Sequence, residues 1–119
     1  MFVYYLNIPL NQTGIEEFES YADEMPNVST VELSSSEYQI LRRPNGLFSI
    51  FDQEFGTIID VCEEERIELS QLDRAIELTE KKKGKSKDEV ERLAINKVLQ
   101  SLQGAKEAAT FWEIDIYLE

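Results

Sequence analysis

The residues of this chain that could do chemistry are almost all carboxylates. A pair of Asp and Glu side chains can serve as general acid and base at a glycosidic bond, or can bind Mg²⁺ or Ca²⁺. Six of them lie near the ends of predicted strands: Asp52, Glu54, Asp60, Glu63, Glu64 and Glu65. The run from Glu63 to Glu65 lacks the alternate spacing and the glycine of a calcium-binding loop. We therefore predict no catalytic and no metal-binding residues here, and a surface role for the carboxylates.

Other reactive side chains are scarce. The chain has no histidine, which excludes the usual Ser-His-Asp and Cys-His sets and zinc sites built from His and Cys. The only cysteine, Cys62, lies among acidic residues, an environment that disfavours a thiolate nucleophile. Gly84-Lys85-Ser86 matches the end of a phosphate-binding loop, but Thr79 stands where that loop needs glycine. We therefore predict that the protein is not an enzyme and has no cofactor.

The charge of the chain is unevenly distributed. Its 119 residues include 24 acidic and 12 basic side chains, which gives a formal net charge of −12. All of this excess lies in residues 1–73, with fifteen acidic and three basic residues, whereas residues 74–119 have nine of each. A surface of one sign repels nucleic acid and anionic membranes and attracts basic proteins. We expect a basic protein partner, no direct contact with nucleic acid and no membrane binding.

Composition indicates one folded domain covering residues 1–119. Hydrophobic residues make up 42% of the chain, which is enough to form a core despite the charge. The lone cysteine cannot form an internal disulfide, and this favours a reducing compartment. The sequence has neither a basic leader segment nor a run of about 20 apolar residues. These features predict a cytoplasmic protein.

Hydrophobic periodicity predicts an α+β fold. Apolar residues at helical spacing predict helices over residues 14–25, 68–82 and 87–109. Aromatic and β-branched runs, together with an Asn45-Gly46 turn, predict strands at residues 2–9, 31–33, 38–41, 47–51, 57–61 and 111–118. The expected order is β-α-β-β-β-β-α-α-β. It describes a single, mostly antiparallel sheet of about five or six strands, with three helices packed on one face and the first and last strands side by side.

The first predicted helix separates its residues into an apolar and an acidic face. Five carboxylates without a basic neighbour share the acidic face, and three more follow the predicted strand over residues 57–61. These eight residues are the predicted partner-binding surface: Glu16, Glu17, Glu19, Asp23, Glu24, Glu63, Glu64 and Glu65. Each carboxylate would pair with Lys or Arg of a partner. Such pairs contribute little individually but steer association.

Two segments carry a resemblance to a known class of proteins. The stretch Gly56–Ile67 with the Leu-rich helix after it, and the segment Phe111–Tyr117, resemble bacterial polymorphic-toxin immunity proteins, which are short, acidic, one-domain α+β chains. The resemblance implies a non-enzymatic protein that neutralises a cognate toxin by direct contact. A toxin nuclease or another nucleic-acid enzyme is the expected target, because its substrate groove must be positive.

Three alternatives remain open from the sequence. A phage-type inhibitor that mimics DNA and blocks a host defence enzyme would have carboxylates spaced like phosphates along an elongated surface. A small carboxylate-based enzyme would need a concave pocket holding a buried Asp or Glu with a raised pKa. A housekeeping subunit could dimerise through exposed apolar residues such as Leu78, Leu93 and Leu99. The sequence does not fix the oligomeric state.

Overall fold

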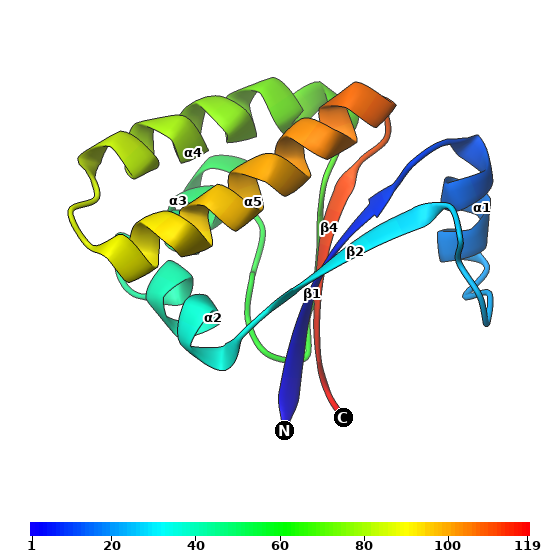
Figure 1. Ribbon diagram of the computed structural model, residues 1–119, viewed down its shortest axis with the longest axis horizontal. Helices are drawn as coiled ribbons and strands as arrows, with labels where there is room; N and C mark the ends of the chain where they lie inside the picture. The colour runs from blue at the N-terminus through cyan, green and yellow to red at the C-terminus, as the bar shows by residue number, and fades with distance from the viewer.

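The computed structural model describes residues 1–119 and contains one four-stranded sheet with helices on one face and at one end (Figure 1). The strand order is β2-β1-β4-β3, and every neighbouring pair is antiparallel. The strands are β1 (Phe2–Pro9), β2 (Val28–Leu33), β3 (Glu64–Ile67) and β4 (Trp112–Leu118). The helices are α1 (Gln12–Glu19), α2 (Ser35–Arg42), α3 (Leu47–Phe55), the 3₁₀ helix η1 (Leu69–Gln71), α4 (Leu72–Lys85) and α5 (Glu89–Ala108).

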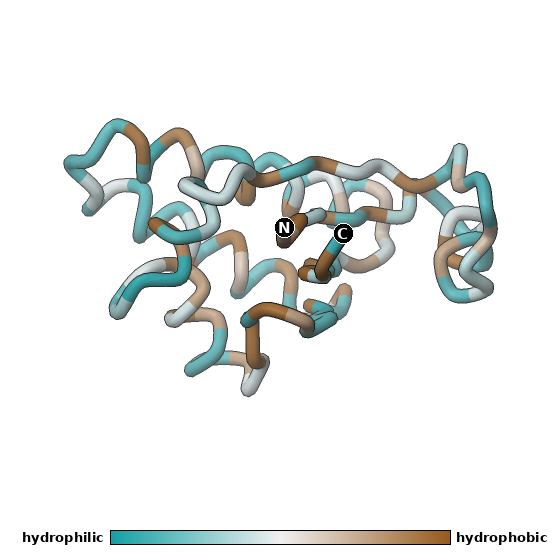
Figure 2. The backbone as a smooth tube through the Cα atoms, turned by 90° about the horizontal axis from the view of Figure 1, so that it is seen from below, coloured by the Kyte–Doolittle hydropathy of each residue, from teal (hydrophilic) through white to brown (hydrophobic).

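Strands β1 and β4 form the centre of the sheet. They pair through six successive residues, and the backbone N–H of Glu119 donates to the carbonyl oxygen of Met1 at 2.9 Å. The two ends of the chain accordingly lie side by side in both views (Figures 1 and 2). The predictions of a strand over residues 2–9 and of adjacent first and last strands are confirmed.

One face of the sheet is apolar and packs against the helices. Successive strand residues point to opposite faces, so alternate residues of β1 and β4 enter the core. The ring of Tyr4 on β1 stacks on Tyr38 of α2 with 4.3 Å between centroids. Trp112 of β4 packs edge-on against Phe51 of α3 at 6.1 Å. These contacts belong to a cluster of 21 buried residues that joins α2, α3, α4 and α5 to the sheet.

Two segments predicted to be strands are helices. Residues 38–41 lie in α2, and residues 47–51 lie in α3. Helix α2 begins with a capping box, in which the Glu37 N–H donates to the Ser34 hydroxyl at 3.1 Å and the Ser34 N–H donates to the Glu37 carboxylate at 2.8 Å. These two bonds satisfy backbone donors at the start of the helix. The prediction relied on strand propensity, which local capping and tertiary burial outweigh here.

Burial in these helices recurs at every third residue, as on one face of a helix. Tyr38 and Leu41 are buried in α2, and Phe48 and Phe51 are buried in α3. The Asn45-Gly46 pair joins the two helices and closes no hairpin. Its asparagine takes the left-handed φ of 64°, and its glycine is the N-cap of α3.

The prediction of a strand over residues 57–61 is also wrong. This segment pairs with no neighbouring strand, Val61 lies in a turn, and only Ile59 in it is buried. The chain then turns at Cys62, which has a left-handed φ of 65°. Strand β3 comes from Glu64–Ile67 and lies at an edge of the sheet rather than at its centre. The acidic run predicted to follow the sheet therefore contributes a strand to it.

The first helix is shorter than predicted. The expected helix over residues 14–25 ends at Glu19, because Tyr21 takes a left-handed φ of 54° that breaks the helical path. Its N-cap is Asn11, whose side-chain oxygen accepts a hydrogen bond from the Gly14 N–H at 2.9 Å. The helices predicted over residues 68–82 and 87–109 correspond to α4 and α5.

The α+β class is confirmed, but the predicted order of elements is not. The sheet has four strands rather than five or six, there are five α-helices rather than three, and the observed order is β-α-β-α-α-β-α-α-β. Helices α2 to α5 lie on the apolar side of the sheet, while α1 stands at one end of it (Figures 1 and 2). None of the helices combines the length and the apolar character needed to cross a membrane.

Candidate functional site

The second face of the sheet carries polar side chains, and we call it the polar face. It is formed by the residues that alternate with the core positions on each strand. On β4 these are Glu113, Asp115 and Tyr117, and the strand register sets Arg66 of β3 opposite Glu113 and Glu64 of β3 opposite Asp115. Glu113 and Asp115 are both more than nine-tenths buried, with 7% and 9% exposure. Two acidic side chains are therefore held, largely buried, in the middle of a sheet.

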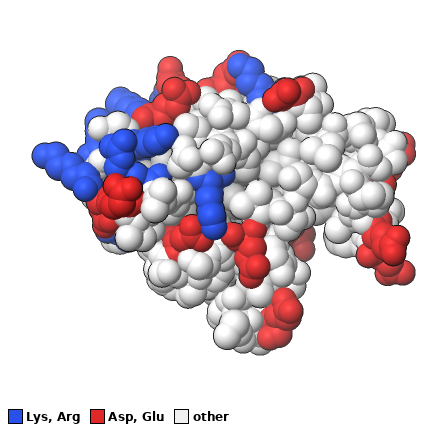
Figure 3. Space-filling model, in the orientation of Figure 1, with Lys and Arg blue, Asp and Glu red and all other residues white.

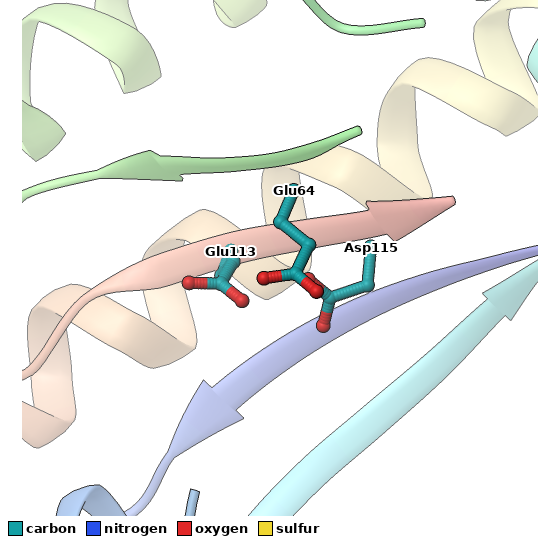
Figure 4. Close-up of side chains that lie close together, drawn as sticks. All are labelled: Glu64, Glu113 and Asp115. Atoms are coloured by element: carbon teal, nitrogen blue, oxygen red, sulfur yellow. The ribbon is translucent and has the colours of Figure 1, made fainter. Parts of the chain in front are cut away.

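Three carboxylates of the polar face form a compact cluster, which we call the carboxylate cluster. Glu64, Glu113 and Asp115 each offer an oxygen, and these oxygens all lie within 4.8 Å of one another. Figure 4 shows the three carboxyl groups converging from β3 and β4. Like charges at such separations repel strongly unless a proton or a cation lies among them.

Asp115 is the most constrained member of the cluster. Its Oδ2 accepts a hydrogen bond at 2.6 Å from the side-chain amide of Asn7 on β1, and the Asn7 oxygen accepts one at 2.7 Å from the Thr30 hydroxyl on β2. Its Oδ1 is buried and has no hydrogen-bond partner. Burial, and then the nearby Glu113 and Glu64 carboxylates, raise the pKa of Asp115 from its ordinary value of 3.8 to about 8.

Arg66 is the only cation of the polar face near this cluster. Its Nε donates to Glu113 Oε1 at 3.0 Å, and its terminal nitrogen lies 3.3 Å from Glu19 Oε1 on α1. The guanidinium lies over the ring of Phe111, 3.7 Å from its centroid. Arg66 thus ties α1 to the sheet, but no ion pair joins it to Glu64 or Asp115.

A cavity of about 470 Å³ opens between the polar face and the α1 end of the chain, and we call it the cleft. Its wall on the α1 side includes Phe18, Glu19 and Tyr21, and its floor includes the carboxylate cluster with Arg66 and Tyr117. Four carboxylates and a single guanidinium line it, so its net charge is negative while all the carboxylates are ionised. The cleft suits a cationic group or a proton better than an anion.

The predicted partner-binding residues fall into two groups. Glu16, Asp23, Glu24 and Glu63 are exposed and form no ion pair. Asp23 and Glu24 follow α1 rather than belonging to it, because the helix ends at Glu19.

The second group has partners inside the protein. The Glu17 carboxylate accepts hydrogen bonds from the backbone and side-chain nitrogens of Asn27 at 3.0 and 2.9 Å. The Glu65 carboxylate accepts the Ile58 N–H at 3.0 Å. Glu19 pairs with Arg66, and Glu64 lies in the carboxylate cluster. Glu17 and Glu65 therefore stabilise loops of the protein and are unsuited to pairing with a partner.

Glu113, Asp115 and Asn7 were not predicted as site residues, and the predicted absence of metal ligands stays a prediction. The strand over residues 111–118 was predicted from its alternating apolar residues, without use of the polar residues between them. The signal was present, because two acidic residues inside an apolar strand must either face solvent or form a site. Of the six carboxylates considered for chemistry, Glu64 alone lies in the cluster. Asp52, for example, accepts hydrogen bonds from Thr57 and Ile59.

The two ends of the molecule carry opposite charge. Figure 3 shows acidic side chains around α1 and a dense group of basic side chains where α4 meets α5. The basic residues there include Lys82, Lys83 and Lys85 in the last turn of α4, where cations are stabilised by the helix dipole. The helix predicted over residues 68–82 extends three residues further, to Lys85.

Comparison with protein-family models, with curated proteins and with solved structures found no match to this chain. The arrangement itself defines what the site can do. The carboxylate cluster can hold a proton, bind a cation or donate a proton to a bound molecule, and the exposed acids around α1 can meet basic groups of a partner.

Proposed function

We propose that this protein binds a basic surface of another protein, as a small inhibitor or immunity protein does, and that it uses its acidic end. The acidic end consists of the exposed carboxylates on α1, in the loop after it and across the cleft: Glu16, Glu19, Asp23, Glu24 and Glu64. One observation carries the proposal. Of these residues, only Glu19 is paired with a cation of the protein itself, and that cation is Arg66.

The separation of acidic and basic residues on the surface supports this proposal. The lysine-rich residues 81–87 lie where α4 meets α5, far from α1 (Figure 3), and Arg66 is the only basic residue that pairs with the acidic end. Opposed potentials speed the encounter of two proteins and fix their orientation. Each rim pair contributes only about 0–1 kcal/mol, so the carboxylates mainly set rate and specificity.

Two exposed tyrosines offer aromatic contact area, which the charged side chains of the acidic end lack. Tyr21 is 81% exposed beside the acidic loop, and Tyr117 is 47% exposed on the polar face. Both line the cleft. Tyrosine is enriched among residues that dominate binding energy, because its large ring loses little conformational freedom on binding. We expect Tyr21 to be an anchor that the surrounding carboxylates orient toward the partner.

The test is a matched pair of charge reversals. Glu16→Lys with Glu24→Lys changes the acidic end, and Glu80→Lys with Glu107→Lys makes the same change in net charge at exposed, unpaired residues of α4 and α5. The protein is used to capture its partner from the source cell, and affinities are then measured with the purified partner. We expect the first variant to bind far more weakly and the second to bind like the unaltered protein, with affinity falling as salt rises. Equal binding by both variants, or a partner without a basic surface, would refute the proposal.

A second candidate is a small enzyme that uses its carboxylates. The cleft supplies the concave pocket with a buried carboxyl group that this alternative requires, and Asp115 would be its proton donor. Asn can replace Asp115 with little change of shape. If the protein cleaves glycosides, Asp115→Asn should abolish turnover while Glu16→Gln should not. Absence of glycoside turnover by the unaltered protein would eliminate this candidate.

A further inference from the structure

We propose that Glu64, Glu113 and Asp115 bind a single divalent cation of the oxygen-preferring class, Mg²⁺, Mn²⁺ or Ca²⁺, at the floor of the cleft. The inference goes beyond the proposed partner binding and does not depend on it. It is carried by the geometry of the carboxylate cluster and by an unpartnered oxygen of Asp115.

The spacing of the cluster fits a shared ion. Its oxygens lie within 4.8 Å of one another. Oxygen ligands lie roughly 2.3–2.6 Å from Ca²⁺ and about 2.0–2.1 Å from Mg²⁺, so two ligands on opposite sides of an ion are separated by about 4–5 Å. Separations within this limit allow the three oxygens to share one ion of either size. Glu64 is exposed, so its side chain can adjust to the ion that binds.

Asp115 provides an independent observation that points to a ligand. The residue is 9% exposed, and its Oδ1 is buried without any hydrogen-bond donor. A buried acceptor left without a partner is costly in free energy. Its other oxygen is fixed by Asn7, which is fixed in turn by Thr30, so the carboxyl group cannot simply rotate to find a donor elsewhere. Such supporting hydrogen bonds are characteristic of groups that orient metal ligands.

The side chains of the cleft carry an excess of negative charge, which a divalent cation can balance. Glu19 and the three cluster carboxylates are opposed by Arg66 alone, and Arg66 forms ion pairs with just Glu19 and Glu113. Arg66 holds Oε1 of Glu113, which leaves Oε2 free to coordinate. A cation with two positive charges would bring this group of five charged side chains close to neutrality.

The chemistry of the donor set selects the class of ion. All three ligands are carboxylates, and neither histidine nor cysteine joins them. Zinc and copper favour nitrogen and sulfur ligands, whereas Mg²⁺, Mn²⁺ and Ca²⁺ favour oxygen. The cleft above the cluster has room for water molecules to complete the coordination shell.

The experiment uses the full chain after treatment with a chelator. Calorimetric titration with CaCl₂, MgCl₂ and MnCl₂ at constant ionic strength should give saturable binding of one ion per chain at or below millimolar concentration. Mn²⁺ is paramagnetic, so it should broaden the NMR signals of residues 64–66 and 113–115 first. This measurement needs no variant and therefore does not depend on the folding of one.

Two variants then separate a specific site from general attraction to an acidic protein. Asp115→Asn removes a proposed ligand and keeps an oxygen that can accept from Asn7, and it should weaken binding by about tenfold or more. Glu80→Gln removes an exposed, unpaired carboxylate of α4 and should change affinity by less than about twofold. The proposal is overturned if no saturable binding occurs at millimolar cation, if broadening centres elsewhere, or if the two variants weaken binding equally. These results do not bear on partner capture, which is tested by charge reversal at residues outside the carboxylate cluster.

Discussion

The side-chain amide of Asn7 donates a hydrogen bond of 2.6 Å to the Asp115 carboxylate across the two central strands. The two residues are 108 positions apart in sequence, and the bond is buried. It orients an acidic group inside the sheet and leaves that group with one oxygen unpartnered. The stability of the protein, its dependence on pH and its proposed cation binding therefore all involve Asn7 and Asp115.

Removing the amide should destabilise the protein. Asn7→Ala leaves Asp115 Oδ2 without its donor and the Thr30 hydroxyl without its acceptor, and we expect a loss of about 1–3 kcal/mol in the free energy of unfolding. Urea denaturation measures it. Asn96→Ala is the matched control, because Asn96 accepts its bond from a surface lysine at 2.8 Å, and it should change stability by less than about 0.5 kcal/mol. Equal losses in the two variants would contradict the assigned role.

Stability of the cation-free protein should fall as pH rises. Because folding raises the pKa of Asp115 to about 8, the folded state holds this proton more tightly than the unfolded chain does. The resulting contribution to stability is complete below the ordinary pKa of 3.8 and is lost as pH rises through about 8. Glu37, whose pKa is lowered by its bonds to Ser34 and Lys97 despite partial burial, acts in the opposite direction and only on acidification.

Urea denaturation in the presence of a chelator, between about pH 5 and pH 9, checks this dependence. The Asp115→Asn variant lacks the group and should show a much flatter profile over the same range. A variant profile as steep as that of the unaltered protein would assign the pH dependence to other groups. Added Ca²⁺ should restore stability at the alkaline end if the proposed site binds it, since the ion replaces the proton.

Gly14 should be sensitive to the addition of a single methyl group. A Cβ at this position would collide with the backbone carbonyl of Asn27, which lies where the loop after α1 enters β2. We expect Gly14→Ala to lower stability by about 1–3 kcal/mol and to displace α1. Gly104→Ala is the control, because a Cβ there meets nothing within 4 Å and α5 should gain about 0.5–1 kcal/mol. A stable, undisturbed Gly14→Ala protein would show that this close approach is not needed.

Tyr21 should matter for binding but not for folding. Tyr21→Asn removes the ring while asparagine tolerates the left-handed φ of 54°, so stability should be nearly unchanged. If Tyr21 is the anchor of the proposed interface, the variant should lose about 2 kcal/mol or more of binding free energy. Leu93→Gln, at a 60% exposed residue of α5, is the matched control and should bind normally. Normal binding by Tyr21→Asn would show that Tyr21 does not anchor the interface.

The elements predicted correctly from the sequence are those whose structure follows from a local pattern of residues. The runs that form β1 and β4 are long and rich in aromatic and branched residues, and α5 keeps its apolar spacing over 20 residues. These elements were found with boundaries close to those observed. The class of fold follows from them, and so does the adjacency of the first and last strands.

The errors come from short segments whose structure is decided by contacts elsewhere. Residues 38–41 and 47–51 are apolar enough for strands, but they pack as helices against Tyr4 and Trp112. The site was missed for the same reason. Nothing near Asp115 in the sequence indicates Asn7 or Glu64, because the pairing of β1 and β3 with β4 brings them together.

The position of β4 also determines when this chain can fold during synthesis. It follows the other three strands in sequence and is the only strand that bonds to both β1 and β3. Until residues 112–118 leave the ribosome, the sheet lacks a central strand and the helices have no completed sheet to pack against. Such long-range closure slows folding and leaves apolar surface open to aggregation in the meantime. A nascent chain that stalls before β4 would therefore be a substrate for chaperones.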